Sequence, residues 1–263
     1  LRIDVDVNLT TASAATNTTN RLIIGSGGLL VNGARTVQAG IWAGTSGTDE
    51  LVIYNNSTLN VGILANNTTS GRIKASGITK TGAGTFQILS EQPDFSGDIR
   101  VQQGALQFQY TGTTASNVTS VMGGVGGNIL LQGNNTSLIL RIGNDNWTAP
   151  GGTFSFNNSV VLGDYVSTAT INYDRAGGNI SGKRIILNNL TFGQNNGDVG
   201  QVLRLLGPTN DAFSIQFNGT TTLVGRSSIA VDNNYSSGAN DAFLMGKVTG
   251  SGMLVKGPSD SRT

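Results

Sequence analysis

The 263-residue sequence contains no cysteine and no histidine, and it has only five lysines, two glutamates and four prolines. Without cysteine, disulfide frameworks and thiolate metal sites are excluded. Without histidine, acid–base catalysis would need a carboxylate pair or a lysine. The scarcity of lysine and glutamate, which favour helices, argues against a helical protein.

Two kinds of segment are also missing. No run of about 18 apolar residues occurs, so no stretch is expected to span a bilayer as a helix. The first residues lack the basic start and apolar stretch of a signal peptide. If the protein is exported, we therefore expect the sequence to be a mature piece or a fragment of something longer.

The sequence is rich in glycine, asparagine, threonine and serine. It has 38 glycines, 12% charged residues, 37% hydrophobic residues and a net charge of +1. Disordered chains usually combine low hydrophobicity with high net charge, so this composition indicates a folded protein. Sixteen basic residues set against 15 acidic ones leave no basic stripe for nucleic acid.

Short apolar stretches recur along the whole chain and end at glycine or at Asn-Asn. The first stretch, Leu1 to Leu9, alternates apolar and polar residues, as a half-buried strand does. This pattern of short apolar stretches continues along the chain without a change in composition, and no interdomain linker is evident. It predicts an all-β chain in which residues 1–263 form one elongated parallel β-helix. If each coil takes about 20 to 25 residues, the chain makes on the order of ten to thirteen coils.

Asn-Asn pairs recur between these apolar stretches. Asparagine tolerates the left-handed conformation and caps its own backbone, so we expect corners there, with side chains that ladder between successive coils. The pairs are Asn55/Asn56, Asn66/Asn67, Asn134/Asn135, Asn157/Asn158, Asn188/Asn189, Asn195/Asn196 and Asn233/Asn234.

Residues 76–108 carry the most specific pattern. They read SGITKTGAGTFQILS, then, from Phe95, FSGDIRVQQGALQF. Alternation predicts an inward-facing core and glycine at turns or bulges. The predicted core residues are Phe86, Ile88, Phe95, Ile99, Val101, Leu106 and Phe108, and the predicted turn glycines are Gly77, Gly82, Gly84, Gly97 and Gly104.

This segment resembles the autotransporter-associated β-strand repeat, whose pattern is a Gly-Leu-x-Lys-x-Gly-x-Gly-Thr-Leu strand, a Tyr-or-Phe-x-Gly turn and a strand ending in Gly-x-Leu. Residues 249–257 resemble a partial second copy that departs after Lys256. The resemblance implies a right-handed parallel β-helix, exported to the bacterial cell surface as an autotransporter passenger. The membrane barrel of that family is absent from these residues.

Catalytic and metal-binding patterns are weak. The candidate carboxylate sites are Asp4/Asp6, Asp94/Asp98 and Asp174/Arg175. Asp4 and Asp6 have a simpler reading as outer-face residues of a strand, and Asp94 and Asp98 as turn-capping residues. Asn144-Asp145-Asn146 offers oxygen ligands for calcium but has no EF-hand spacing, so an Asx turn is the favoured reading. The glycine-rich stretch 123–127 is not followed by a phosphate-binding pattern. We expect no catalytic residues, cofactor or metal.

The function predicted from the sequence is a non-enzymatic extracellular scaffold or fibre segment of a bacterial surface protein. One alternative is an adhesin that binds glycans or a host protein through exposed aromatic residues such as Trp42, Trp147 and Tyr235. The other is a polysaccharide-degrading β-helix enzyme, which would gather carboxylates and basic groups in one groove. Expected partners are further β-helix coils stacked end to end, since an uncapped coil exposes unpaired backbone.

Overall fold

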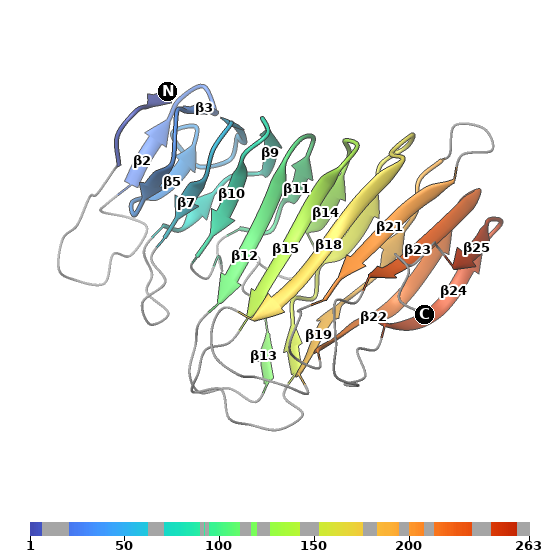
Figure 1. Cartoon of the computed structure of the whole chain (residues 1–263). Coiled ribbons are helices and arrows are strands. Elements are labelled where there is room, and N and C mark those ends of the chain that lie inside the picture. Colours follow the sequence, from blue (N-terminus) through green and yellow to red (C-terminus); the bar gives the residue numbers. More distant parts are fainter. Residues whose placement is uncertain are drawn as a thin grey trace.

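The protein is an all-β parallel solenoid that forms a single elongated domain, with its N-terminal and C-terminal coils at opposite ends (Figure 1). The computed structural model describes residues 1–6, 21–62, 71–89, 92, 95–110, 117–119, 127–142, 153–175, 183–194, 200–207, 213–232 and 243–256. Every strand pairing among them is parallel. The described residues contain no helix, and so none that could cross a membrane.

The largest sheet, sheet A, has 13 strands in the described part of the chain. Its main ladder contains β1 (Arg2–Ile3), β3 (Gly28–Val31), β6 (Glu50–Asn55), β9 (Gly77–Thr81), β11 (Asp98–Val101), β14 (Asn128–Leu131), β17 (Ser159–Leu162), β20 (Leu190–Thr191), β22 (Phe213–Leu223) and β24 (Phe243–Gly250). A second ladder contains β13 (Asn117–Thr119), β16 (Thr153–Ser155) and β19 (Lys183–Leu187). The two ladders merge because the long strand β22 pairs with β19 through its first half and with β20 through its second.

Two further sheets complete the coil. Sheet B contains β4 (Arg35–Val37), β7 (Leu59–Val61), β10 (Thr85–Ile88), β12 (Ala105–Tyr110), β15 (Thr136–Ile142), β18 (Thr168–Arg175), β21 (Gln201–Leu206), β23 (Arg226–Asp232) and β25 (Met253–Lys256). Sheet C contains β2 (Arg21–Ile24), β5 (Gly40–Ala43) and β8 (Ile73–Lys74). The chain visits the sheets in turn, so each new coil adds a strand to the growing ladders.

The coils are unequal in length, and most are longer than the short repeat expected from the sequence. In sheet B, the chain returns quickly from Thr85 to its partner Ala105, whereas the return from Thr168 to its partner Val202 is much longer. Sheet B has nine stacked strands in the described residues, fewer than the expected number of coils. The excess residues lie in the strands of the second ladder and in the connections between sheets.

The core is a set of apolar columns along the axis of the coil. Strands such as β15 and β21 alternate buried and partly exposed residues, as period 2 requires, and parallel pairing places like positions over one another. Ile78 stacks on Ile99 and Phe86 stacks on Leu106, so the two halves of the 76–108 segment are successive coils. At most 2% of the surface is exposed in Phe86, Ile88, Phe95, Ile99, Val101, Leu106 and Phe108.

Asparagine side chains tie one coil to the next at the corners. The Asn55 amide donates to the backbone oxygens of Ser57 and Thr85, at 2.6 and 3.1 Å. The Oδ1 atom of Asn189 accepts the Thr220 amide, 31 residues later, at 2.8 Å. The predicted corner role is confirmed at the described pairs, although most bonds run to the backbone and not to another asparagine. Asn66/Asn67, Asn195/Asn196 and Asn233/Asn234 lie outside the described residues.

Two positions at the corner between β9 and β10 require glycine for different reasons. Gly82 has a φ of 82°, in the left-handed region that favours glycine. Gly84 lies so close to the coil beneath it that an added Cβ would be 1.9 Å from the Ser57 oxygen. Of the other predicted turn glycines, Gly104 also has a positive φ, whereas Gly77 and Gly97 lie against the backbone of a neighbouring coil.

The partial second copy aligns differently from the sequence-based expectation. Gly250 and Gly252 form the corner between β24 and β25, where added Cβ atoms would lie 2.1 and 2.3 Å from oxygens of the coil beneath. This corner is the structural equivalent of Gly82 and Gly84. Residues 249–254 therefore correspond to the turn of the motif, and the expectation that they open its first strand is wrong.

Sheet C ends at β8 because a glutamine side chain takes the place of a fourth strand. Gln92 is 1% exposed. Its Oε1 atom accepts the Ile73 amide at 2.6 Å, and its Nε2 atom donates to the Gly71 oxygen at 3.1 Å. These are the hydrogen bonds that a further strand would make, so the edge is satisfied although the next coil is short.

The first strand is shorter than the alternation predicts. β1 comprises Arg2 and Ile3. Among the apolar residues expected to face inward, Ile3 is buried, whereas Leu1 and Val5 are 53% and 70% exposed. β1 is the outermost strand of sheet A and pairs only with β3, so no further strand in the described part covers its flanks. Within residues 1–6, the predicted strand is therefore confirmed for Arg2–Ile3 alone, and residues 7–9 lie outside the described part.

Candidate functional site

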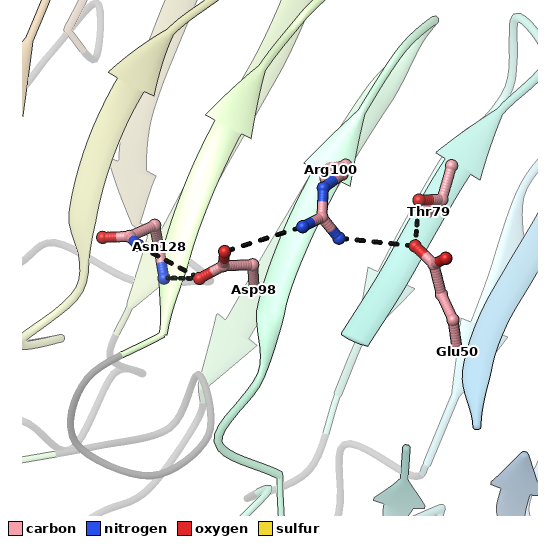
Figure 2. Close-up of polar contacts among 5 residues, drawn as sticks. All are labelled: Glu50, Thr79, Asp98, Arg100 and Asn128. Atoms are coloured by element: carbon pink, nitrogen blue, oxygen red, sulfur yellow. Dashed lines mark hydrogen bonds and ion pairs between the residues drawn. The ribbon is translucent and has the colours of Figure 1, made fainter. Parts of the chain in front are cut away.

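An outer polar row crosses four strands of sheet A (Figure 2). It consists of Glu50 on β6, Thr79 on β9, Asp98 and Arg100 on β11, and Asn128 on β14. All five occupy the outer positions of alternating strands, where parallel register brings residues from different coils side by side. The row therefore joins polar side chains from four successive coils.

The two carboxylates of the row are each held by neighbours. Thr79 Oγ1 donates to Glu50 Oε1 at 2.6 Å, and Arg100 Nη1 lies 3.4 Å from the same oxygen. Arg100 Nη2 lies 3.8 Å from Asp98 Oδ2, while the amide and side chain of Asn128 donate to Asp98 Oδ1 at 2.9 and 3.1 Å. One arginine thus links two carboxylates across coils, as the dashed lines in Figure 2 show.

The outer polar row is better suited to linking successive coils than to acid–base catalysis. The Glu50, Asp98 and Arg100 side chains are 44%, 33% and 37% exposed. Ion pairs of this exposure contribute roughly 0 to 1 kcal/mol each. A paired carboxylate that is open to water lacks the burial or like-charge neighbour that tunes a general acid.

The other carboxylate candidates are engaged separately. Arg2 Nε donates to Asp4 Oδ1 at 3.0 Å and lowers the pKa of that carboxyl. Asp6 Oδ1 accepts the Thr36 amide at 2.9 Å, so the two aspartates predicted on one strand face have different partners and no common strand. Asp174 lies 3.7 Å from Arg141 on the neighbouring strand of sheet B.

Several predicted features lie outside the described residues. These are Asp94, Asn144 to Asn146, Trp147, Tyr235 and residues 123–126 of the glycine-rich stretch, and the side chain of Arg175 is likewise not described. Within the described ranges, no group of three or more carboxylates is placed to hold a metal ion.

Trp42 lies at the centre of the outer face of sheet C. The Arg21 guanidinium carbon, from β2, is 4.0 Å from the centre of the indole ring, and Lys74 Nζ, from β8, is 4.4 Å from it. Register places Ile23 and Lys74 on either side of Trp42. The tryptophan and its two cations come from three different coils, and this geometry is favourable for cation–π attraction.

Lys80 is a buried cation that the sequence reasoning missed. It lies in an inward column between Ile53 and Val101, and it is 0% exposed. Its ammonium donates to the backbone oxygens of Gly82 and, at 2.6 Å, Gln103. Burial lowers its pKa from 10.5 to about 8. The available signal was the alternation itself, which places Lys80 on the same side as Ile78.

The function of Lys80 is structural in this geometry. Its two acceptors lie at the corners of successive coils, where the backbone turns away from the sheet ladders. The ammonium therefore satisfies carbonyls that no strand neighbour reaches, and it links one coil to the next from inside.

Comparison of the chain with protein-family models, with curated proteins and with solved structures found no match.

Proposed function

We propose that the chain is a segment of a non-enzymatic extracellular scaffold or fibre of a bacterial surface protein, built as a right-handed coil like autotransporter passengers. The observation that supports this most is one hydrophobic cluster running from Ile3 to Ile229 through successive coils. In a solenoid each coil contacts only its neighbours, so adding coils to one continuous core lengthens the protein without a second domain. The resemblance of residues 76–108 to the passenger repeat supports the location.

The placement of charge also supports a scaffold. The ion pairs of Glu50 with Arg100 and of Arg141 with Asp174 both cross between coils on the outer face. Asparagine corners and Lys80 make further links along the axis. These side chains serve to hold one coil to the next.

The partner expected for a scaffold is a further β-coil at the C-terminal edge. β24 and β25 are the last strands of their ladders in the described part, and Val248 and Leu254, which stack on the buried Thr221 and Ser227, are 44% and 37% exposed. At the other end, Ile24, Leu29 and Val37 are at most 2% exposed. We propose that a parallel strand pair adds to β24 and β25, since no described strand pairs with their outer edges and apolar side chains lie beside them.

The location and role can be tested on the bacterial cell. Antibodies raised against the 263-residue chain should label an extended structure on intact cells by immunogold electron microscopy, and surface proteolysis should remove the label. Label found only after permeabilisation would contradict the proposal. Cells from which the gene is deleted provide the control.

The enzyme alternative is tested by product release. The wild-type chain should release no reducing ends or unsaturated products from plant, algal and bacterial polysaccharides. Steady turnover that is abolished by Asp98→Asn or Glu50→Gln, with folding retained, would replace the scaffold proposal with an enzyme. The adhesin alternative has a separate supporting observation in the cations around Trp42.

A further inference from the structure

We infer that the outer face of sheet C is a binding site for an acidic polysaccharide, one that carries carboxylate or sulfate groups along its chain. We call this face the basic plate, and it consists of Arg21, Ile23, Trp42, Arg72 and Lys74. A scaffold needs no such site, so the inference goes beyond the proposed function. It rests on how alternation and register assemble these side chains.

The basic plate forms because each strand of sheet C buries the alternate residues. Ile41 is 0% exposed and Ile24 is 2% exposed, while Trp42 and Lys74 remain partly exposed. Parallel register then sets two columns on the outer face. The first column consists of Ile23, Trp42 and Lys74. The second consists of Arg21, Gly40 and Arg72, because Gly40 pairs with Arg21 and the pairing of Ile41 with Ile73 sets Arg72 beside Gly40.

The strands of the plate carry basic and apolar side chains. The plate carries three cations, and no acidic residue occurs in 21–24, 40–43 or 72–75, although the whole chain has 16 basic and 15 acidic residues. Neighbouring strands are about 4.8 Å apart, so Arg21 and Arg72 stand on strands about 10 Å apart. An anionic polymer lying across the three strands would be attracted by each cation in turn.

Trp42 fixes the position of the cations. With Arg21 and Lys74 held over the indole ring at 4.0 and 4.4 Å, less side-chain freedom is lost when an anion binds. The indole Nε1 is covered and has no hydrogen-bond partner among the described residues. Ile23, 43% exposed, supplies an apolar contact beside the charges for the carbon face of a sugar ring.

The geometry favours a polysaccharide over a nucleic acid. Nucleic acid binding depends on neutralising many phosphates along a stripe, and three cations on one small sheet cannot do this. A polymer with an anionic group on successive sugar units requires only a few cations spaced along its length. The inference therefore names an acidic polysaccharide as the ligand.

The test measures binding of the complete 263-residue chain to polygalacturonate and dextran sulfate, with neutral dextran as the uncharged control, by biolayer interferometry. Both acidic polymers should bind and dextran should not, and added salt should weaken binding. The double variant Arg21→Gln, Lys74→Gln should lose affinity about tenfold or more, since it removes two charge-assisted contacts. The matched control Arg184→Gln, Lys247→Gln removes two cations from sheet A and should bind like the wild type.

A fluorescence readout locates the ligand without relying on the charge variants. The chain has two tryptophans, so Trp147→Phe leaves Trp42 as the single reporter. Its emission should change on adding polygalacturonate and stay constant with dextran. Absence of binding to either acidic polymer, equal binding by the double variant, a silent Trp42, or equally tight binding to duplex DNA or to phosphatidylserine vesicles would each overturn the inference.

Discussion

Lys80 gives the sharpest test of the packing, because it sets a cation in an aliphatic column. The column runs Leu29, Ile53, Lys80, Val101 and Leu131 in successive coils. Replacing the residue by methionine keeps an unbranched chain of similar length and removes the charge. The change also leaves the Gly82 and Gln103 oxygens without the ammonium.

The sign of the pH effect follows from the lowered pKa. The folded protein loses this proton near pH 8, whereas the unfolded chain keeps it up to about pH 10.5. Between these values the unfolded state binds more protons, so the free energy of unfolding rises with pH. A shift from 10.5 to about 8 corresponds to at most about 3 kcal/mol across that window.

At neutral pH the two effects of Lys80→Met oppose each other. Removing a buried charge recovers up to about 3 kcal/mol, while two carbonyls that lose their donor cost about 1 to 3 kcal/mol each. The informative quantity is therefore the slope, and not the stability at one pH. Urea unfolding followed by far-UV circular dichroism from pH 8 to 10.5 should show a rise in the wild type that the variant lacks.

The control for this experiment is Lys247→Met, which removes an exposed lysine from β24. It should keep the wild-type slope. Parallel curves for wild type and Lys80→Met across the window would refute the reasoning, because a buried ammonium released on unfolding must leave that signature.

Three further predictions concern stability, each measured by urea unfolding. Phe86→Ala, in the fully buried core, should cost roughly 3 to 5 kcal/mol, and Gln87→Ala on the outer face is its control; a loss under about 0.5 kcal/mol would show that the motif is not packed as described. Gly84→Ala should destabilise strongly, because its Cβ would lie 1.9 Å from the Ser57 oxygen, whereas Gly25→Ala has nothing within 4 Å and should be nearly neutral; equal effects would contradict the close approach of the coils. Arg100→Gln should cost no more than about 1 kcal/mol, and a larger loss would mean that the outer polar row determines stability.

The sequence predicted the architecture well because its signals are local. Period-2 alternation in short stretches, with glycine and asparagine between them, predicts short strands and corners without knowledge of any partner strand. The inward positions Phe86 and Ile99 and the corner asparagines follow from that pattern alone. Register does not follow from it, because each partner lies a whole coil away and the coils differ in length, as the pairing of Thr85 with Ala105 shows beside that of Thr168 with Val202.

The missed features share this non-local origin. Lys80 alternates with apolar residues, but only stacking on the next coil brings the Gln103 oxygen within 2.6 Å of its ammonium. The equivalence of Gly250 and Gly252 to Gly82 and Gly84 likewise depends on which backbone lies beneath each corner. The outer polar row joins Glu50 to Arg100, 50 residues apart, through two coil returns. Composition cannot show such contacts.

The 76–108 segment also lies at a change in the cross-section of the coil. Before it, each coil contributes strands to sheets A, B and C. After it, a strand of the second ladder, β13, β16 or β19, comes before each of the main-ladder strands β14, β17 and β20 of sheet A in the chain. Between them, the described residues of the coil of β11 and β12 add strands only to sheets A and B. The return from Thr85 to Ala105 that closes this coil is the shortest among the described pairings of sheet B.

Where the described part of this coil adds no third strand, a side chain satisfies the groups that a strand would otherwise cover. Gln92 does this for the edge of sheet C. Lys80 acts at a different place, the corner between sheets A and B, where it donates to the carbonyls of Gly82 and Gln103. Both side chains are buried. Gln92 therefore lets the solenoid pass through the short coil without leaving the backbone edge of sheet C unpaired, while Lys80 and the glycines of the motif join successive corners between sheets A and B.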